Sequence, residues 1–482
     1  MKHKLSNQSL ICIPSSTQLL TSNSACNKAF LLAKPAVSSI IMIATISLLL
    51  FSSTGCKKVM ECVHDHMGND SSHVQLKWSK AHGGTDNDFC FDFAETHDGA
   101  YTVTGLTFSD DGEVSGSHGN GDMWVYRMDR SGNIIWQKAI GGSEHDEGES
   151  VTVTPDNYYV VAGNTNSNDK SVSGNHGGQD IWVVKLDFQG QLIWQKTYGG
   201  SGTEGMYFHS IINTPDGGFM MLGYTTSNDD DVSGNHGGQD IWLVKIDGTG
   251  NIQWQKTYGG TSTDYSSSLY TAADGNYLIV GYSNSNDGDI TGNHGDYDTW
   301  IAKVDGSGNI LWKKTYGGSG LDVNYKFVPT ADGGYILNGQ TNSPNDGDVT
   351  GWHGDFDAWV VKIDANGNMQ WNRAFGSSQY EDNFAITTTA DGNYLLGAFT
   401  NGNDGDVTNP IGGYDVWYVK LSTAGDIVWQ ETIGGTGDET VNNILPMPDG
   451  SFLAGGHSTS SDGDVKGQHG AWDQWLYTFT VK

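Results

Sequence analysis

The chain has 482 residues and a formal net charge of −31 at pH 7. A surface this acidic repels nucleic acid and anionic membranes, so we expect neither as a direct partner. Glycine supplies 67 residues and there are three arginines, Arg127, Arg130 and Arg373, too few to build a phosphate- or carboxylate-binding cluster.

The first 55 residues read as an export signal. Residues 36–51 are apolar and follow scattered lysines, but the stretch is too short to span a bilayer comfortably. It ends in Ser52-Ser53-Thr54-Gly55 before Cys56, which resembles the lipobox of bacterial lipoproteins. That resemblance implies a signal peptide over residues 1–55, a lipid on Cys56 and a tether over residues 56–72. It also implies the outer membrane of a bacterial envelope as location. A plain secretory signal and an uncleaved anchor are the alternatives.

Five cysteines are present. Cys12 and Cys26 would leave with the signal peptide, and Cys56 would carry the lipid. Outside the cytoplasm the remaining two, Cys62 and Cys90, can pair or stay as free thiols. The spacing of the five indicates no metal site.

Internal repeats dominate the rest of the chain. A tryptophan recurs in steps of 58, 58, 60, 58, 59 and 58 residues, at Trp78, Trp136, Trp194, Trp254, Trp312, Trp371 and Trp429. A second tryptophan series runs through Trp124, Trp182, Trp242, Trp300, Trp359, Trp417 and Trp475. A glycine series runs through Gly105, Gly163, Gly223, Gly281, Gly339, Gly397 and Gly455. Seven units of about 58 residues therefore fill residues 73–482.

Each unit reads as four short strands. In the copy between Trp194 and Trp254 we expect strands over residues 209–213, 219–223, 241–246 and 251–256. Two tight Gly-containing turns and one long Gly/Asp/Asn loop separate them. Four antiparallel strands repeated at near-constant spacing predict an all-β, seven-bladed β-propeller with four-stranded blades.

The two ends of the repeat region complement each other. It begins with a single strand, residues 74–78, that resembles the outer, fourth strand of a unit. It ends with residues 474–478, which resemble the third strand, so the last unit lacks its fourth strand. We therefore expect the N-terminal strand to complete the last blade and close the ring, which removes exposed sheet edges.

The repeated hairpin L-D-x-x-G-x-I-x-W resembles the tryptophan-docking segment of quinoprotein-type propellers and, distantly, the Asp-box turn of sialidases. The complete unit, with W-Q-K-T-Y-G-G and S-N-D-G-D-V-S-G-N-H-G-G-x-D-x-W, resembles the repeat propellers of Bacteroidota envelope proteins. That resemblance implies a surface location and a binding role.

The long loops lie together on one face of the predicted ring and carry most of its candidate binding residues. Closely spaced aspartates in a Gly-rich loop can supply the oxygen ligands that calcium prefers. The candidate ligands are Asp229, Asp231, Asp287, Asp289, Asp346, Asp348, Asp404, Asp406, Asp462 and Asp464. The alternative is that Asp, Asn and Gly serve only as turn residues that bond their own backbone.

The same loops carry a recurring histidine, replaced by Ile411 in the sixth copy. We expect each to tie its own loop to a backbone carbonyl, with metal binding or pH sensing as the alternative. These residues are His118, His176, His236, His294, His353 and His469. The repeated tryptophans are expected to pack between blades. Trp352 and Trp472 occur in one loop each and are the candidates for sugar contact.

These patterns favour a binding or scaffold module, expected as a monomer, whose acidic long-loop face meets a protein or glycan at the cell surface. Calcium is the one cofactor considered. A multivalent lectin is the alternative, and a glycoside hydrolase ranks third. Catalysis needs a nucleophile or acid–base pair unlike its symmetry mates. We identify no such residue in the repeats, so we expect no enzyme activity.

Overall fold

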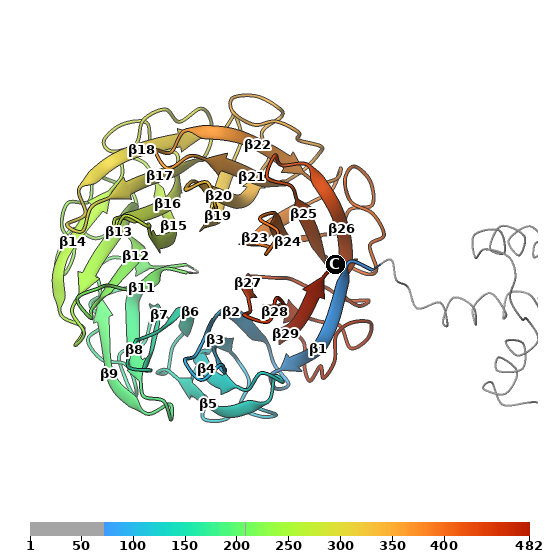
Figure 1. The fold of residues 1–482 in the computed structure, drawn as a ribbon. Coiled ribbons are helices and arrows are strands. Elements are labelled where there is room, and N and C mark those ends of the chain that lie inside the picture. The colour runs from blue at the N-terminus through green and yellow to red at the C-terminus, as the bar shows by residue number, and fades with distance from the viewer. Residues whose placement is uncertain (1–71, 208) are drawn as a thin grey trace, which may run out of the picture. The chain divides into compact units, whose positions relative to one another are not determined.

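The computed structural model describes residues 72–207 and 209–482. The predicted signal peptide, Cys56, Cys62 and the tether over residues 56–72 lie outside these residues, apart from Ser72. Residues 73–482 form one compact unit in which seven sheets surround a central axis (Figure 1); six have four strands, and in the seventh the first strand is broken into two short ones. The predicted seven-bladed β-propeller is confirmed. Within the described ranges, no helix has the length and apolar character needed to cross a membrane.

The first strand of each blade lies at the axis and the fourth at the rim (Figure 1). Blade 1 contains β2 (Asp88–Glu95), β3 (Tyr101–Thr107), β4 (Asp122–Met128) and β5 (Ile134–Ile140). Blade 2 contains β6 (Asp146–Val153), β7 (Tyr159–Thr165), β8 (Asp180–Leu186) and β9 (Leu192–Tyr198). Blade 3 contains β10 (Glu204–Gly205), β11 (Ile211–Asn213), β12 (Phe219–Thr225), β13 (Asp240–Ile246) and β14 (Ile252–Tyr258).

The remaining blades repeat this order. Blade 4 contains β15 (Asp264–Thr271), β16 (Tyr277–Ser283), β17 (Asp298–Val304) and β18 (Ile310–Tyr316). Blade 5 contains β19 (Asp322–Pro329), β20 (Tyr335–Thr341), β21 (Asp357–Ile363) and β22 (Met369–Phe375). Blade 6 contains β23 (Glu381–Thr388), β24 (Tyr394–Thr400), β25 (Asp415–Leu421) and β26 (Ile427–Ile433). Blade 7 contains β27 (Asn443–Pro446), β28 (Phe452–Ser458), β29 (Asp473–Val481) and, as its outer strand, β1 (Val74–His82).

Blade 7 joins the two ends of the ring. β1 pairs antiparallel with β29, from Val74 opposite Val481 to His82 opposite Gln474. Glu431 of the neighbouring blade also accepts hydrogen bonds from the backbone N–H groups of His73 and Val74, at 2.7 and 3.0 Å. The predicted closure by the N-terminal strand is confirmed.

Tryptophans build the contacts between blades. The indoles of the second series, on the third strands, are fully buried. In the first series, the Trp78 indole N–H donates to Arg130 O at 2.9 Å, and its ring lies over Gly132 of the adjacent blade. Rings of the same series lie over the equivalent glycines of five more blades: Gly190, Gly250, Gly308, Gly367 and Gly425. Both series pack as the sequence predicts.

The recurring glycines do not all occupy the same structural position. In blades 1 to 5 the glycine of the series lies opposite the buried tryptophan, as with Gly339 and Trp359. In blades 6 and 7 the residues opposite Trp417 and Trp475 are Ala398 and Gly456. The reason is an extra residue in the loop after Ser343, which shifts every later position by one.

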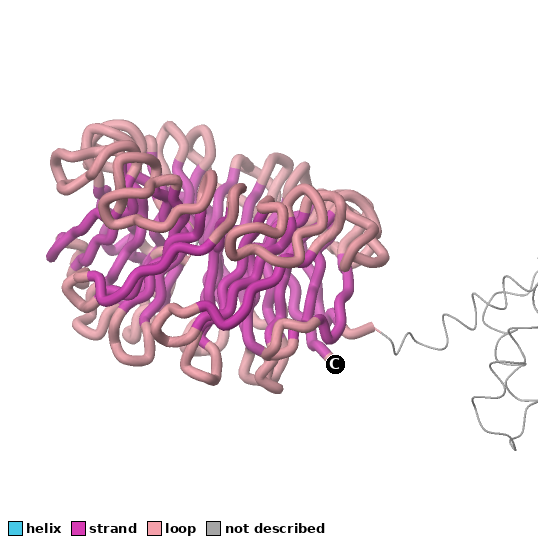
Figure 2. Tube along the Cα trace, turned by 90° about the horizontal axis from the view of Figure 1, so that it is seen from above, coloured by secondary structure: helices cyan, strands magenta, loops and turns pink. Residues whose placement is uncertain are grey.

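The loops lie on two opposite faces of the ring (Figure 2). Hairpin turns between first and second strands, and between third and fourth strands, form the short-turn face. Loops between second and third strands, with the connectors between blades, form the long-loop face. The innermost strands of blades 1, 2, 4, 5 and 6 carry a β-bulge, for example between Cys90 and Asp92. Cys90 itself is a buried free thiol in β2.

Candidate functional site

The first aspartate of each predicted calcium loop holds the adjacent connector. Asp287 Oδ1 accepts from Thr261 N at 2.7 Å, and its Oδ2 accepts from the Thr261 hydroxyl at 2.8 Å. All seven copies accept the equivalent backbone N–H: Asp111, Asp169, Asp229, Asp287, Asp346, Asp404 and Asp462. Charge-assisted bonds of this kind are stronger than neutral ones. This carboxylate therefore acts as a loop clamp.

The second aspartate of each loop has different contacts from the first. Asp231 and Asp406 face histidines of the preceding blade, His176 and His353, at 4.0 and 3.6 Å. Asp289, Asp348 and Asp464 occupy the same loop position. Within residues 72–207 and 209–482, no group of three or more His, Cys, Asp or Glu side chains could hold a metal ion. Calcium binding stays an untested prediction.

The loop histidines bond a different group from the one expected. His176 Nδ1 lies 2.7 Å from Asp180 Oδ2, and its backbone N–H donates to the same oxygen at 3.0 Å. His236, His294, His353 and His469 repeat this arrangement, while His118 Nδ1 is 3.9 Å from Asp122. In blade 6, where Ile411 replaces the histidine, Asp415 accepts from the backbone N–H groups of Ile411 and Gly412. Five of these six histidine rings thus tie their own loop, but to a buried carboxylate rather than to the predicted backbone carbonyl.

Two buried carboxylates meet at every blade junction. At the first glycine of the connector, Asp240 Oδ1 and Asp264 Oδ2 each lie 2.6 Å from the point a β-carbon on Gly259 would occupy. One ring comprises Asp122, Asp180, Asp240, Asp298, Asp357, Asp415 and Asp473, and the Oδ1 of each has no hydrogen-bond partner. The other comprises Asp88, Asp146, Glu204, Asp264, Asp322, Glu381 and Glu439. Burial raises the pKa of Asp88 and of Asp298 to about 6.

The structure separates the two sugar-contact candidates. Trp352 is half-buried against the hydrophobic core shared by blades 4 and 5, and its indole N–H donates to Asp355 O at 3.1 Å. Trp472 lies beside the axis, with ring centroids 5.0 Å from His457 and 6.4 Å from Phe89. By position, Trp472 is therefore the candidate that can contact an axial ligand.

Partly exposed aromatic rings surround the axis on the long-loop face, and we name this set the aromatic collar. One group links blades 3 and 4, through contacts such as Tyr224 with Tyr265 at 6.4 Å. Another links blades 5 and 6, with the ring centroids of Tyr325 and Phe384 at 4.6 Å. The collar consists of Phe89, Tyr207, Tyr224, Tyr265, Tyr282, Tyr297, Tyr325, Phe356, Tyr380, Phe384, Phe399, Tyr414, His457 and Trp472.

The collar uses positions at which the seven repeats differ. The residues that follow the glycine position on the second strands are Leu106, Asn164, Tyr224, Tyr282, Gln340, Phe399 and His457. The repeats are thus uniform where they build the scaffold and unlike one another at the axis. Aligning the seven copies column by column would have exposed this pattern, whereas searching for recurring residues hides it.

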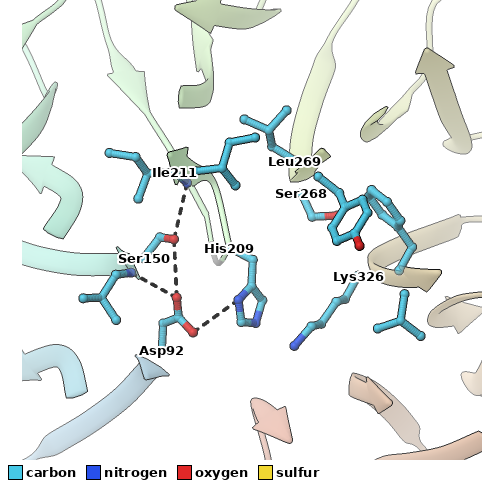
Figure 3. A pocket seen from close by; sticks show the side chains of 12 residues that line it. Asp92, Ser150, His209, Ile211, Ser268, Leu269 and Lys326 are labelled. Atoms are coloured by element: carbon cyan, nitrogen blue, oxygen red, sulfur yellow. Dashed lines mark hydrogen bonds and ion pairs between the residues drawn. The ribbon is translucent and has the colours of Figure 1, made fainter. Parts of the chain in front are cut away.

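Farther along the axis, a cavity of about 230 Å³ opens among the innermost strands of blades 1 to 5 (Figure 3). Asp92 Oδ1 lies 3.2 Å from His209 Nδ1 and accepts from Asn443 Nδ2 at 3.0 Å. Its Oδ2 accepts from Val151 N at 3.0 Å. Lys326 donates to Asn443 Oδ1.

Burial sets the charge state of this cluster. It raises the pKa of Asp92 to about 6 and lowers that of Lys326 to about 8, although the Asp92 charge opposes the lysine shift. The pKa of His209 falls well below its usual value because of burial and the nearby Lys326 charge. Burial thus favours the neutral form of each of the three groups, and the attraction between the Asp92 and Lys326 charges opposes that shift.

A two-residue insertion brings His209 into the cavity. Between Met206 and Ser210, blade 3 has three residues where blade 2 has only Glu149, which accounts for the repeat step of 60. The first strand breaks there into β10 and β11, and His209 adopts φ 54°. The predicted strand over residues 209–213 thus begins only at Ile211.

No family model matches the chain. Regulatory protein FlaEY of Caulobacter vibrioides is 23% identical over 423 residues, which covers 77% of this chain and 42% of that protein. The chain thus spans less than half of that relative's length.

The distant structural neighbours are β-propeller proteins. BamB of Moraxella catarrhalis is 13% identical with a TM-score of 0.40, over 85% of this chain and 100% of that one. Hydrazine synthase of Kuenenia stuttgartiensis is 15% identical with a TM-score of 0.46, over 79% and 94%. The WD40 domain of Neurospora crassa Pan2 is 11% identical with a TM-score of 0.43, over 85% and 96%.

Proposed function

We propose that this chain is a lipid-anchored binding protein of the bacterial outer membrane, carried on Cys56, that recognises a partner protein through the aromatic collar. The N-terminal sequence supports the location. The observation that supports the binding site is the collar itself, in which rings from unlike repeat positions gather at one end of the axis. Binding residues concentrate on loops held by a rigid scaffold, and Tyr and Trp dominate interface energetics. We propose that the protein binds without catalysing a reaction.

The chemistry of the collar favours a partner segment rich in Lys and Arg. Tyrosine faces attract such cations when the cation lies over the ring. Exposed acids border the rings, including Asp296 beside Tyr297 and Asp355 beside Phe356. The net charge of −31 steers a basic partner toward this surface.

Binding of immobilised peptides to residues 73–482 tests this proposal. We expect Lys/Arg-rich peptides to bind and Glu-rich peptides of equal length not to bind. A Tyr265→Ser, Tyr414→Ser double variant should lose most of the affinity. Tyr158→Ser, on the short-turn face, is the matched control. Equal binding by the double variant and the wild type would show that diffuse charge, and not the collar, attracts the peptide.

A lectin is the second candidate. Trp472 favours it, because a half-exposed indole beside Phe89 and His457 can stack on a sugar ring. A glycan array decides between the two: a signal that grows with glycan valency and falls in Trp472→Ala would favour the lectin. We also keep calcium as a proposed aid to loop order.

A further inference from the structure

We infer that the axial cavity is a second binding site, separate from the collar, that takes a small organic carboxylate on the Lys326 ammonium. This inference goes beyond the proposed function and does not depend on it. It rests on the geometry of the cavity wall, the way Lys326 is paired, and the differences among the seven repeats.

Lys326 is paired unlike the buried lysines of the third strands. Lys245, Lys362 and Lys420 each contact an aspartate, at 2.7 to 2.8 Å. In the part of the chain that the structure describes, Lys326 has no carboxylate within 4.0 Å, and its one hydrogen-bond acceptor is the neutral Asn443 amide. Asp92 attracts the Lys326 charge only from a distance. A buried ammonium without a carboxylate in direct contact is costly, and a bound anion would offset that cost.

Asp92 cannot neutralise Lys326 by direct contact, because other donors already occupy it. His209 Nδ1, Asn443 Nδ2, the Val151 N–H and the Ser150 hydroxyl all approach its two oxygens, the last at 3.4 Å. The repeat position of Lys326 also holds no other cation. Its counterparts are Asp92, Ser150, Ser210, Ser268, Ala385 and Asn443.

The residues that line the cavity indicate what the part of the ligand beyond its carboxylate must be. Ile212, Tyr270 and Val328 line the cavity as partly exposed apolar side chains. A volume of about 230 Å³ suits a ligand of a few heavy atoms. His209 Nε2 has no hydrogen-bond partner, and with its Nδ1–H donated to Asp92 it can accept from a ligand hydroxyl. The nearby Asp92 charge and the protein's negative field disfavour multiply charged anions. A short-chain monocarboxylate fits these conditions.

Calorimetric titration of residues 73–482 with butyrate and with n-butylamine tests the inference. At pH 7 we expect butyrate to bind in the millimolar range or tighter and n-butylamine not to bind. Lys326→Met should weaken butyrate binding at least tenfold. Lys313→Met, on the outer strand β18, is the matched control and should leave it unchanged. Because the lysine pKa is about 8, butyrate affinity of the wild type should fall as pH rises from 7 to 9.5.

The inference is overturned if butyrate does not bind, if n-butylamine binds equally well, or if Lys326→Met binds butyrate like the wild type. Should Lys326→Met fail to fold, Lys326→Gln takes its place, and a butyrate affinity of that variant equal to the wild type sinks the idea. The Tyr265→Ser, Tyr414→Ser variant should retain butyrate binding, so failure of the collar proposal remains distinguishable.

Discussion

Trp78 and Gly132 belong to adjacent blades and lie in direct contact: a β-carbon on Gly132 would stand 2.7 Å from the indole ring. Gly132 also has φ +72°, a conformation that costs other residues about 1–2 kcal/mol. The glycine of the repeated hairpin is thus required twice, once for its backbone and once for the space that the tryptophan occupies.

The first prediction separates these two requirements. Gly217 has φ +82° and no atom within 4 Å of the point that a β-carbon would occupy. Gly217→Ala should therefore lower the free energy of unfolding only by the cost of placing alanine at a positive φ. Gly132→Ala should lower the free energy of unfolding by about 1 kcal/mol or more beyond that, because the methyl group displaces Trp78. Urea denaturation of both variants measures the difference. Equal losses would mean that the indole adapts without cost.

The second prediction concerns ring closure. Deleting residues 73–82 removes β1, exposes the edge of β29 and leaves blade 7 with three strands. We expect a large drop in the unfolding temperature and rapid proteolysis of the C-terminal strands, since open edges are unprotected. A chain that starts at residue 73 is the control. Similar protease resistance of both chains would argue that the ring closes without its N-terminal strand.

The third prediction tests the loop clamps against calcium binding. Asp287→Asn weakens both bonds to Thr261, so the unfolding temperature should fall by a similar amount with chelator and with millimolar calcium. Replacing Asp346 and Asp462 as well should add to the loss. A calcium-specific rise in the wild type that disappears in these variants would make the loops metal sites instead.

The fourth prediction is a dependence of stability on pH. Folded-state pKa values of about 6 for Asp88 and Asp298 exceed the ordinary value of 3.8. The folded chain therefore binds protons more tightly, and this stabilisation is lost as pH rises from about 4 through 6. We expect the unfolding temperature at pH 5 to exceed that at pH 7.5 by about 3 °C or more. Asp298→Asn should reduce the difference, and a temperature that rises toward pH 7.5 would contradict the prediction.

The scaffold could be predicted from sequence because its residues recur. Trp136 and its counterparts mark the fourth, outermost strand of each copy, and Trp182 and its counterparts mark the third strand. Residues 74–78 match the fourth strand, which the last copy lacks. The glycine misassignment at Gly397 shows the limit, since one inserted residue moved the true position to Ala398.

The axial sites could not be predicted in that way. Asp92, His209, Lys326 and Asn443 are far apart in sequence, and ring closure alone brings them together. Each is also unlike its counterparts in the other repeats, so a search for recurring residues passes over them. One feature of the sequence did indicate this site: the spacing of 60 residues between Trp194 and Trp254, which reflects the two-residue insertion that places His209 in the cavity.

Two of the bonds among these four residues join blades that are not neighbours, namely Asp92 with His209 (blades 1 and 3) and Lys326 with Asn443 (blades 5 and 7). The bond between Asn443 and Asp92 joins the adjacent blades 7 and 1, as the tryptophan contacts join neighbours. Any molecule that displaces Lys326 from Asn443 would therefore remove a bond between two blades that have a third blade between them. A small solute bound at the axis could in this way alter the spacing of blades that are not neighbours in the ring.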